Sequence, residues 1–255
     1  GPFIGKAFRG AQNPEFIIAP TVQRIDRMMQ SSRGMIRLMT VAPEAEGVMD
    51  LIGYIAANGI AVSIGHTDAE YDEIKQAVAL GASHMTHFFN GMSPLNHRRP
   101  GAVGAGLLLE GLTLEIICDG LHVHPDLVDF LFKVKRPEKI CFITDSILPT
   151  GYPDGEYVSG GMEVVKKGGR ITLKGRENLA GSCLTMINAF DNACRFVDQP
   201  PEAILPAFTE NPARQAGASL RKGSLESGKD ADFIILDSNG SLRATYVRGT
   251  AVYRA

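Results

Sequence analysis

Five apolar segments of this 255-residue sequence each lead to a residue that can bind a metal ion or transfer a proton. Four segments end on such a residue, at Glu44, His66, His87 and Asp145, and the fifth leads directly into His122. The steps between successive residues are 22, 21, 35 and 23 positions, roughly one strand plus one helix each. In a β/α barrel the carboxyl ends of the parallel strands carry the active site. The spacing therefore predicts such a barrel, with its chemistry at the strand ends.

His66 and His87 are the strongest candidates for metal ligands. A single histidine at a strand end is more often a structural hydrogen-bonding group. Two histidines one βα unit apart, with a carboxylate on a later strand end, can instead converge on one cation, and zinc or another first-row metal suits neutral imidazoles. His84 lies three residues before His87, which places it on the opposite face of the strand, so we interpret it as structural.

Asp145 and His122 are the next candidates. Asp145 follows the apolar segment 141–144, so we expect its carboxylate to be partly removed from water. Beside a bound metal, such a carboxylate can take a proton from water and give it to a leaving group. The alternative is a helix cap or an ion-pair partner. His122 and His124 form an HxH pair, but Asp119-Gly120 already ends the strand. We therefore predict that His122 contacts substrate and that His124 is structural.

Three loop segments carry groups suited to anions or polar oxygens. Arg98, in the loop after His87, can grip a phosphate or carboxylate with its guanidinium fork. Asn90-Gly91 begins the same loop, where backbone amides beside a glycine can hold an anion. Ala180-Gly181-Ser182 precedes a predicted helix, and helix N-termini bind such groups. Each of these signals is weak by itself.

The apolar segments alternate with helical patterns, as a parallel sheet requires. Helices are predicted at residues 21–31, 46–58, 69–80, 125–133, 179–196 and 202–216. Thr67 or Asp68 is expected to cap the third of these, and Gly59 and Gly81 follow two of them as C-terminal caps. Residues 149–178 are predicted to form a long loop with a small β-excursion. Residues 223–255 are predicted to form a small β-module.

The composition narrows the class of protein. The formal net charge is −2, so no basic field favours nucleic acid or an anionic membrane, and we expect neither partner. No apolar run reaches the length of a membrane span and no signal peptide is visible. The four cysteines lack CxxC spacing, which indicates reduced core thiols in a cytoplasmic protein. The chain opens on Gly1 without a methionine, and we expect it to be part of a longer natural chain.

A series of motifs resembles one known family across essentially the whole chain. In order they are GPF, GAQNPE, VAPE, SIGHTDA, MTHFFNGMSP, HRRPG, ICDGLHVHP, FITDS and LAGSCLTM. They are similar to the N-acetylglucosamine-6-phosphate deacetylases of the amidohydrolase superfamily. The closing GSLESGKDADFIILD is typical of the superfamily rather than of the family. The resemblance implies an α/β fold, a metal-dependent hydrolase (β/α)8 TIM barrel at 1–222 that lacks its first strands, and the C-terminal part of a small β-sandwich at 223–255.

The resemblance also implies roles for individual residues. His66 and His87 match metal ligands, and Asp145 matches the catalytic aspartate. The implied substrate-binding residues are Ala11, Asn90, Gly91, Arg98, His122, Ala180, Gly181 and Ser182. Some relatives carry histidine where Gln12 stands, and glutamine cannot supply a proton there. In the family the phosphate-binding arginine crosses a dimer interface, so Arg98 is expected to serve the neighbouring subunit of a homodimer.

The implied reaction is hydrolysis of the acetamide of N-acetylglucosamine 6-phosphate to glucosamine 6-phosphate and acetate. The implied cofactor is one or two divalent cations, such as zinc, iron or manganese. The family's metal-binding glutamate immediately precedes the Gly-Pro at which this chain opens, so the chain resembles the C-terminal two-thirds of the enzyme. Glu44 matches a different glutamate, without an assigned task. The alternatives are an amidohydrolase for another amino sugar or a cyclic amide, and a scaffold without catalysis.

Overall fold

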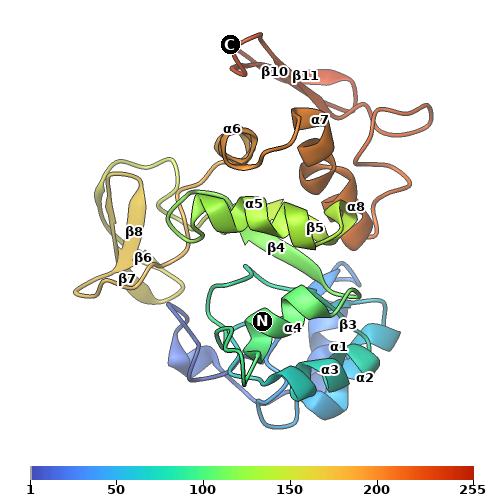
Figure 1. Cartoon of the computed structure of the whole chain (residues 1–255), viewed down its shortest axis with the longest axis vertical. Coiled ribbons are helices and arrows are strands. Elements are labelled where there is room, and N and C mark those ends of the chain that lie inside the picture. The colour runs from blue at the N-terminus through green and yellow to red at the C-terminus, as the bar shows by residue number, and fades with distance from the viewer. Residues whose placement is uncertain (1) are drawn as a thin grey trace.

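A parallel sheet of five strands organises the molecule, and its last two strands cross the middle of the view in Figure 1. The computed structural model describes residues 2–255. The strands lie side by side in sequence order: β1 (Leu38–Val41), β2 (Ala61–Ile64), β3 (Ala82–Met85), β4 (Thr113–Ile117) and β5 (Ile140–Ile143). Every neighbouring pair is parallel, so all five carboxyl ends lie at one edge. The predicted α/β class and the strand series are confirmed.

Helices separate these strands and pack against the sheet. The helices are α1 (Val22–Ser31), α2 (Met49–Ala57), α3 (Tyr71–Ala79), α4 (Gly101–Leu108), α5 (Pro125–Val134), α6 (Met186–Phe196), α7 (Pro201–Ile204) and α8 (Glu210–Gln215), with 3-10 turns η1 (Pro14–Phe16), η2 (Pro137–Lys139) and η3 (Leu205–Phe208). Helix residues such as Ile25 and Ile52 join strand residues such as Val62 and Leu114 in one apolar core. This core fixes the strand ends, and with them the residues that follow each strand.

The sheet continues by one parallel bridge at each outer strand. Phe3 pairs with Val41 at the end of β1, and Ser182 pairs with Ser146 just after β5. The N-terminal segment and the segment around Ser182 therefore flank the sheet on its two sides. A closed barrel needs more strands than the five that these residues form. The eight-stranded barrel stays a prediction.

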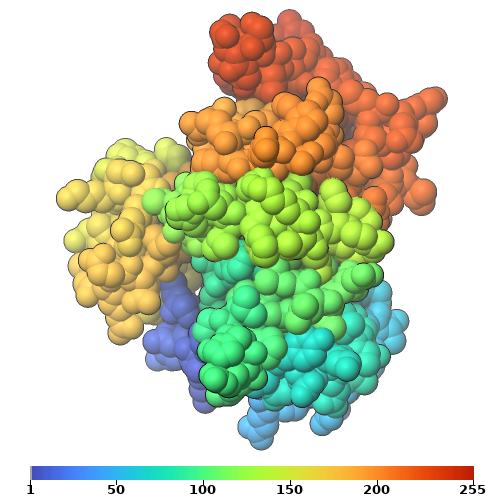
Figure 2. Space-filling model, in the orientation of Figure 1, coloured from blue at the N-terminus to red at the C-terminus, as the bar shows by residue number. Residues whose placement is uncertain are grey.

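Two small antiparallel sheets complete the fold. One consists of β6 (Gly155–Ser159), β7 (Met162–Lys167) and β8 (Arg170–Leu173), and the other of β9 (Phe233–Leu236), β10 (Leu242–Val247) and β11 (Thr250–Arg254). The β6–β8 sheet lies beside the N-terminal loop, and Ala11 packs on its apolar cluster (Figure 2). The C-terminal sheet stands at the far end of the molecule (Figure 1). A sandwich needs two sheets, and residues 223–255 contain one.

Three helix starts lie two or more residues after the predicted ones, and the first of them is α2, which begins at Met49 rather than at residue 46. Helix α3 begins at Tyr71, and Glu70 and Glu73 form a reciprocal capping box, so neither Thr67 nor Asp68 caps it. Helix α6 begins at Met186 with Thr185 as its N-cap, seven residues after the predicted start. Before it, Ser182 is engaged in the bridge beside β5, which keeps that segment extended.

Two other helical segments also differ. The predicted helix at 202–216 is divided into α7, η3 and α8, because Pro206 and Pro212 cannot donate the backbone hydrogen bonds of a continuous helix. Helix α4 was not predicted, since its sequence, GAVGAGLL, has no polar face, and six of its eight residues are buried.

Cys118 and Cys141 are buried, and all four cysteines are free thiols. Across residues 2–255, no helix is long and apolar enough to cross a membrane.

Candidate active site

Three candidate residues share one unusual backbone position. His66, His87 and Asp145 each lie two residues beyond a strand end, after β2, β3 and β5. Their φ angles are 49°, 32° and 51°, in the left-handed region. Non-glycine residues there cost about 1–3 kcal/mol each, and they concentrate at functional sites. The repeated turn brings all three side chains to one cavity of about 550 Å³.

The two histidine rings meet at their Nε2 atoms, which are 3.0 Å apart. The Nδ1 atom of His66 lies 2.9 Å from the carbonyl of Phe8, and that of His87 lies 3.0 Å from the carbonyl of Asn90. Because a carbonyl only accepts, each Nδ1 carries the proton and each Nε2 presents a lone pair. Two lone pairs face each other, an arrangement that a cation between them stabilises.

The protonation state of the pair also suits a metal. Burial, followed by the neighbouring His87, lowers the pKa of His66 to about 4. Burial likewise lowers the pKa of His87. Both imidazoles are therefore neutral near pH 7, as metal ligands must be. Backbone carbonyls that orient the Nδ1 side of each ring are the usual outer partners of ligating histidines.

The chain as described supplies two of the ligands that a metal centre needs. Catalytic zinc sites commonly take three protein ligands. Among residues 2–255, no group of three or more histidine, cysteine, aspartate or glutamate side chains is placed to hold one ion. The donor chemistry of His66 and His87 fits a divalent cation, and the complete centre stays a prediction.

Asp145 lies on the same cavity and is attached to the neighbouring turn. Its backbone carbonyl accepts a hydrogen bond from the Ser182 N–H at 2.9 Å, and the Ser182 hydroxyl donates to the carbonyl of Thr144. Burial raises the pKa of Asp145, although His122 and His66 oppose that shift. An aspartate with a raised pKa holds a proton more readily than an exposed one, as a proton-transferring group requires.

His122 is held by a carboxylate. Its Nδ1 lies 2.6 Å from Asp119 Oδ2, and both side chains are at least 90% buried. Asp119 Oδ1 also accepts from the backbone N–H groups of Leu121 and His122 at 2.8 Å. Burial opposes ionisation, but the bonds from His122 prevail and lower the pKa of Asp119. The ring is thus fixed through Nδ1, which leaves Nε2 for a ligand in the cavity.

The cavity contains most of the predicted site residues, and three lie outside it. Those that line it are Ala11, His66, His87, Asn90, Gly91, His122, Asp145 and Gly181. Ala180 is buried in the cluster of the β6–β8 sheet, and Ser182 is buried beside β5. Because α6 begins only at Met186, the segment 180–182 does not adjoin a helix N-terminus. Arg98 is exposed in the loop after Asn90 and does not line the cavity.

Several lining residues have little signal in the sequence. Phe8 contributes a backbone carbonyl, which no side-chain pattern reveals. Arg9 precedes the Gly-Ala turn at 10–11, and Arg176 and Asn178 follow β8 in a charged loop. Arg9 and Arg176 add positive charge to the cavity, so its composition suits an anionic ligand.

Comparisons with known proteins find relatives along almost the whole length of this chain. The model of the Amidohydrolase family matches residues 40–252. The chain is 38% identical over 253 residues to an N-acetylglucosamine-6-phosphate deacetylase of Bacillus subtilis, a match that covers 99% of this chain and 64% of that protein. It is 34% identical to an N-acetylgalactosamine-6-phosphate deacetylase of Escherichia coli O157:H7, covering 98% and 66%. The chain thus spans just under two thirds of these relatives.

A solved structure gives the same relation. A mutant N-acetyl-D-glucosamine-6-phosphate deacetylase of Mycobacterium smegmatis, in complex with N-acetyl-D-glucosamine-6-phosphate, superposes with a TM-score of 0.94 at 32% identity. The match covers 99% of this chain and 67% of that one. The chain therefore belongs to the amidohydrolase family, in its N-acetylglucosamine-6-phosphate deacetylase branch.

Proposed function

We propose that the protein to which this chain belongs hydrolyses the acetamide of N-acetylglucosamine 6-phosphate, releasing acetate and glucosamine 6-phosphate. The observation that carries the proposal is the pair of neutral histidines with Nε2 atoms 3.0 Å apart, in one cavity with Asp145. The named relatives support the substrate class.

Asp145 is the proposed proton carrier. The Nε2 atoms of His66 and His87 would hold the divalent cation, which would supply Lewis-acid polarisation of the carbonyl and of water. Asp145 takes a proton from the attacking water as the new C–O bond forms at the acetamide carbon. It returns that proton to the nitrogen as the C–N bond breaks. Acetate and the amino sugar are then released, and Asp145 has returned to its starting protonation state.

The remaining residues position the sugar phosphate in this proposal. Asn90, Gly91 and His122 line the cavity beside the histidine pair, where they can contact the sugar and its phosphate. Arg98 is exposed, which suits a contact with substrate bound in a neighbouring subunit of a homodimer. Binding energy from the phosphate then serves to orient the acetamide.

A second candidate substrate is N-acetylgalactosamine 6-phosphate. The 34% identical relative that carries this activity in its name is nearly as similar to the chain as the N-acetylglucosamine relatives are. The two sugars share the acetamide and the phosphate, so the proposed chemistry is the same. Comparison of kcat/KM for the two sugar phosphates decides between them.

The test is acetate release by the wild type and by Asp145→Asn. The amide cannot carry the proton, so we expect turnover to fall by about 10²–10⁴-fold. Asp50→Asn, at an exposed position of α2, is the matched control and should keep full activity. Wild-type turnover in Asp145→Asn would refute the mechanism. If Arg98→Ala weakens phosphorylated and unphosphorylated substrates equally, the sugar-phosphate assignment fails.

A further inference from the structure

Glu44 is the one residue of the strand-end series that the proposed reaction does not use. We propose that it is a positioning residue that holds the backbone at His66 and thereby sets the metal affinity of the His66–His87 pair. This inference rests on the metal site of the proposed function.

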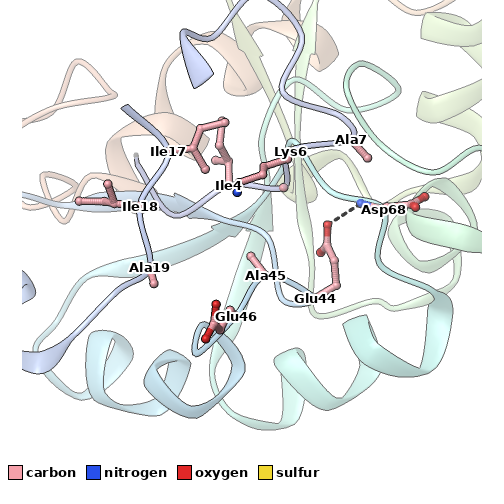
Figure 3. A pocket seen from close by; sticks show the side chains of 11 residues that line it. Ile4, Lys6, Ala7, Ile17, Ile18, Ala19, Glu44, Ala45, Glu46 and Asp68 are labelled. Atoms are coloured by element: carbon pink, nitrogen blue, oxygen red, sulfur yellow. Dashed lines mark hydrogen bonds between the residues drawn. The ribbon is translucent and has the colours of Figure 1, made fainter. Parts of the chain in front are cut away.

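The carboxylate of Glu44 is bound to the two residues that follow His66. Its Oε2 accepts from the Thr67 hydroxyl at 2.5 Å. Its Oε1 accepts from the Asp68 backbone N–H at 2.7 Å, the bond drawn dashed in Figure 3. Thr67 is completely buried, and its Oγ1 accepts from the Ala69 N–H at 3.0 Å. Because a carboxylate only accepts, the hydroxyl proton of Thr67 points to Glu44.

His66 itself is held from both sides. Its carbonyl accepts from the Gly5 N–H at 2.8 Å, and the next N–H, that of Thr67, donates to the carbonyl of Gly91 at 3.0 Å. These bonds and those of Glu44 keep the residue at a φ of 49°, a conformation that side chains other than glycine rarely adopt. Gly5, Glu44 and the turn at residues 66–68, joined by these bonds, are called the clamp below. The clamp connects the segment before β1, the loop after β1 and the turn after β2.

Gly5 shows how closely this clamp is packed. A Cβ atom at Gly5 would lie 2.6 Å from Glu44 Oε1 and 2.8 Å from the His66 carbonyl oxygen. Each of these oxygens also accepts a hydrogen bond, Glu44 Oε1 from the Asp68 N–H and the His66 carbonyl oxygen from the Gly5 N–H. Displacement of the Glu44 carboxylate is therefore transmitted to the backbone of His66, and from there to its ring.

Both oxygens of Glu44 are engaged with the turn, so its effect on the metal is indirect. Without the carboxylate, the Thr67 hydroxyl and the Asp68 N–H lose their acceptor, and the strained turn relaxes. The His66 Nε2 then leaves the position 3.0 Å from His87 Nε2. Loss of a group bonded directly to a metal ligand typically weakens metal binding by about 10–100-fold, and we expect a loss of that order when the turn that carries His66 relaxes.

Glu46 provides a matched control. It is a second acid in the same loop and lines the same cavity of about 430 Å³ beside Glu44 (Figure 3). Its side chain is exposed, and within residues 2–255 it forms no hydrogen bond or ion pair. Removal of its charge changes the local field without loosening the turn.

The experiment measures Zn²⁺ affinity by competition with a chromophoric chelator, using metal-free wild type, Glu44→Ala, Glu44→Gln and Glu46→Ala. We expect Glu44→Ala to raise the Zn²⁺ Kd by about 10–100-fold. Glu46→Ala should change it less than twofold, by about the screened effect of one exposed charge. Glu44→Gln keeps the shape and an acceptor for Asp68, so it should give an intermediate increase, and it replaces Glu44→Ala if that variant fails to fold.

Three outcomes separate the possibilities. A wild type that binds no Zn²⁺ overturns the proposed function and this inference with it. A wild type that binds Zn²⁺, with Glu44→Ala and Glu44→Gln of unchanged Kd, overturns the positioning role alone, even if the variants melt at lower temperature. Equal weakening by Glu44→Ala and Glu46→Ala also overturns it, because charge alone would then be responsible.

Discussion

Gly181 offers a direct test of how the turn after β8 supports Asp145. Its φ is +56°, and a Cβ atom there would lie 2.5 Å from Cγ2 of Ile147 and 2.9 Å from the carbonyl oxygen of Asp145. Gly168, in the hairpin between β7 and β8, has the same φ of +56° with no atom within 4 Å of its added Cβ. Gly181→Ala and Gly168→Ala therefore share one backbone cost and differ in the steric one.

The magnitudes follow from these two contributions. A left-handed alanine costs about 1–2 kcal/mol relative to glycine, and both variants bear this cost. Overpacking against Ile147 and the Asp145 carbonyl adds about 1–3 kcal/mol at Gly181 alone. We expect a loss of about 1–2 kcal/mol for Gly168→Ala and about 2–5 kcal/mol for Gly181→Ala.

Activity should separate the two variants more sharply than stability does. The added methyl group at Gly181 presses on the backbone of Asp145, and a shift of about 1 Å in a reacting group can cost on the order of 10²-fold in rate. Urea denaturation gives the stability difference, and kcat for acetate release gives the effect on chemistry. Equal losses of stability and equal kcat in the two variants would refute the proposed link between Gly181 and Asp145.

Two further predictions concern other charged groups. Asp119→Asn keeps an oxygen acceptor for the backbone but loses the charged bond to His122, which is worth about 1.5–3 kcal/mol. We therefore expect the KM for the sugar phosphate to rise by about 10-fold or more. An unchanged KM would contradict the positioning of His122 by Asp119. Burial raises the pKa of Glu115 from its ordinary 4.5 to about 7. The folded state therefore binds this proton more tightly than the unfolded chain, and its stability falls as pH rises from about 4.5 through 7. Glu115→Gln should remove this decline and stabilise the protein at pH 8 by up to about 3 kcal/mol. Urea denaturation at pH 5 and at pH 8 measures the free energy of unfolding of both proteins. An equal difference between variant and wild type at the two pH values would contradict the prediction.

The site residues that could be predicted from the sequence are those whose position depends on the order of strands along the chain. His66, His87 and Asp145 follow short apolar strands, and parallel strands in sequence order bring their ends together. Strand and helix periodicity are enough to predict that much. The left-handed backbone at all three positions has only a weak sequence signal, because histidine and aspartate are enriched in that region but adopt it in few instances.

What was missed depends on packing between distant segments. Arg176 reaches the cavity because the β6–β8 sheet packs beside the N-terminal loop, and no local pattern encodes that contact. Helix α4 was missed because a helix buried on most sides lacks the polar face by which amphipathic helices are found. The start of α6 was misplaced because the apolar residues before Thr185 serve the sheet edge rather than a helix.

The left-handed positions also bear on how this protein can be stabilised. The three residues proposed to bind the metal and move the proton have a strained backbone conformation. Their neighbours hold each of them at a positive φ. Tightening those neighbours protects both the fold and the reaction. Substitutions that relax the backbone of the three residues would instead raise the stability of the fold and lower the turnover. At these positions a gain in stability therefore costs activity.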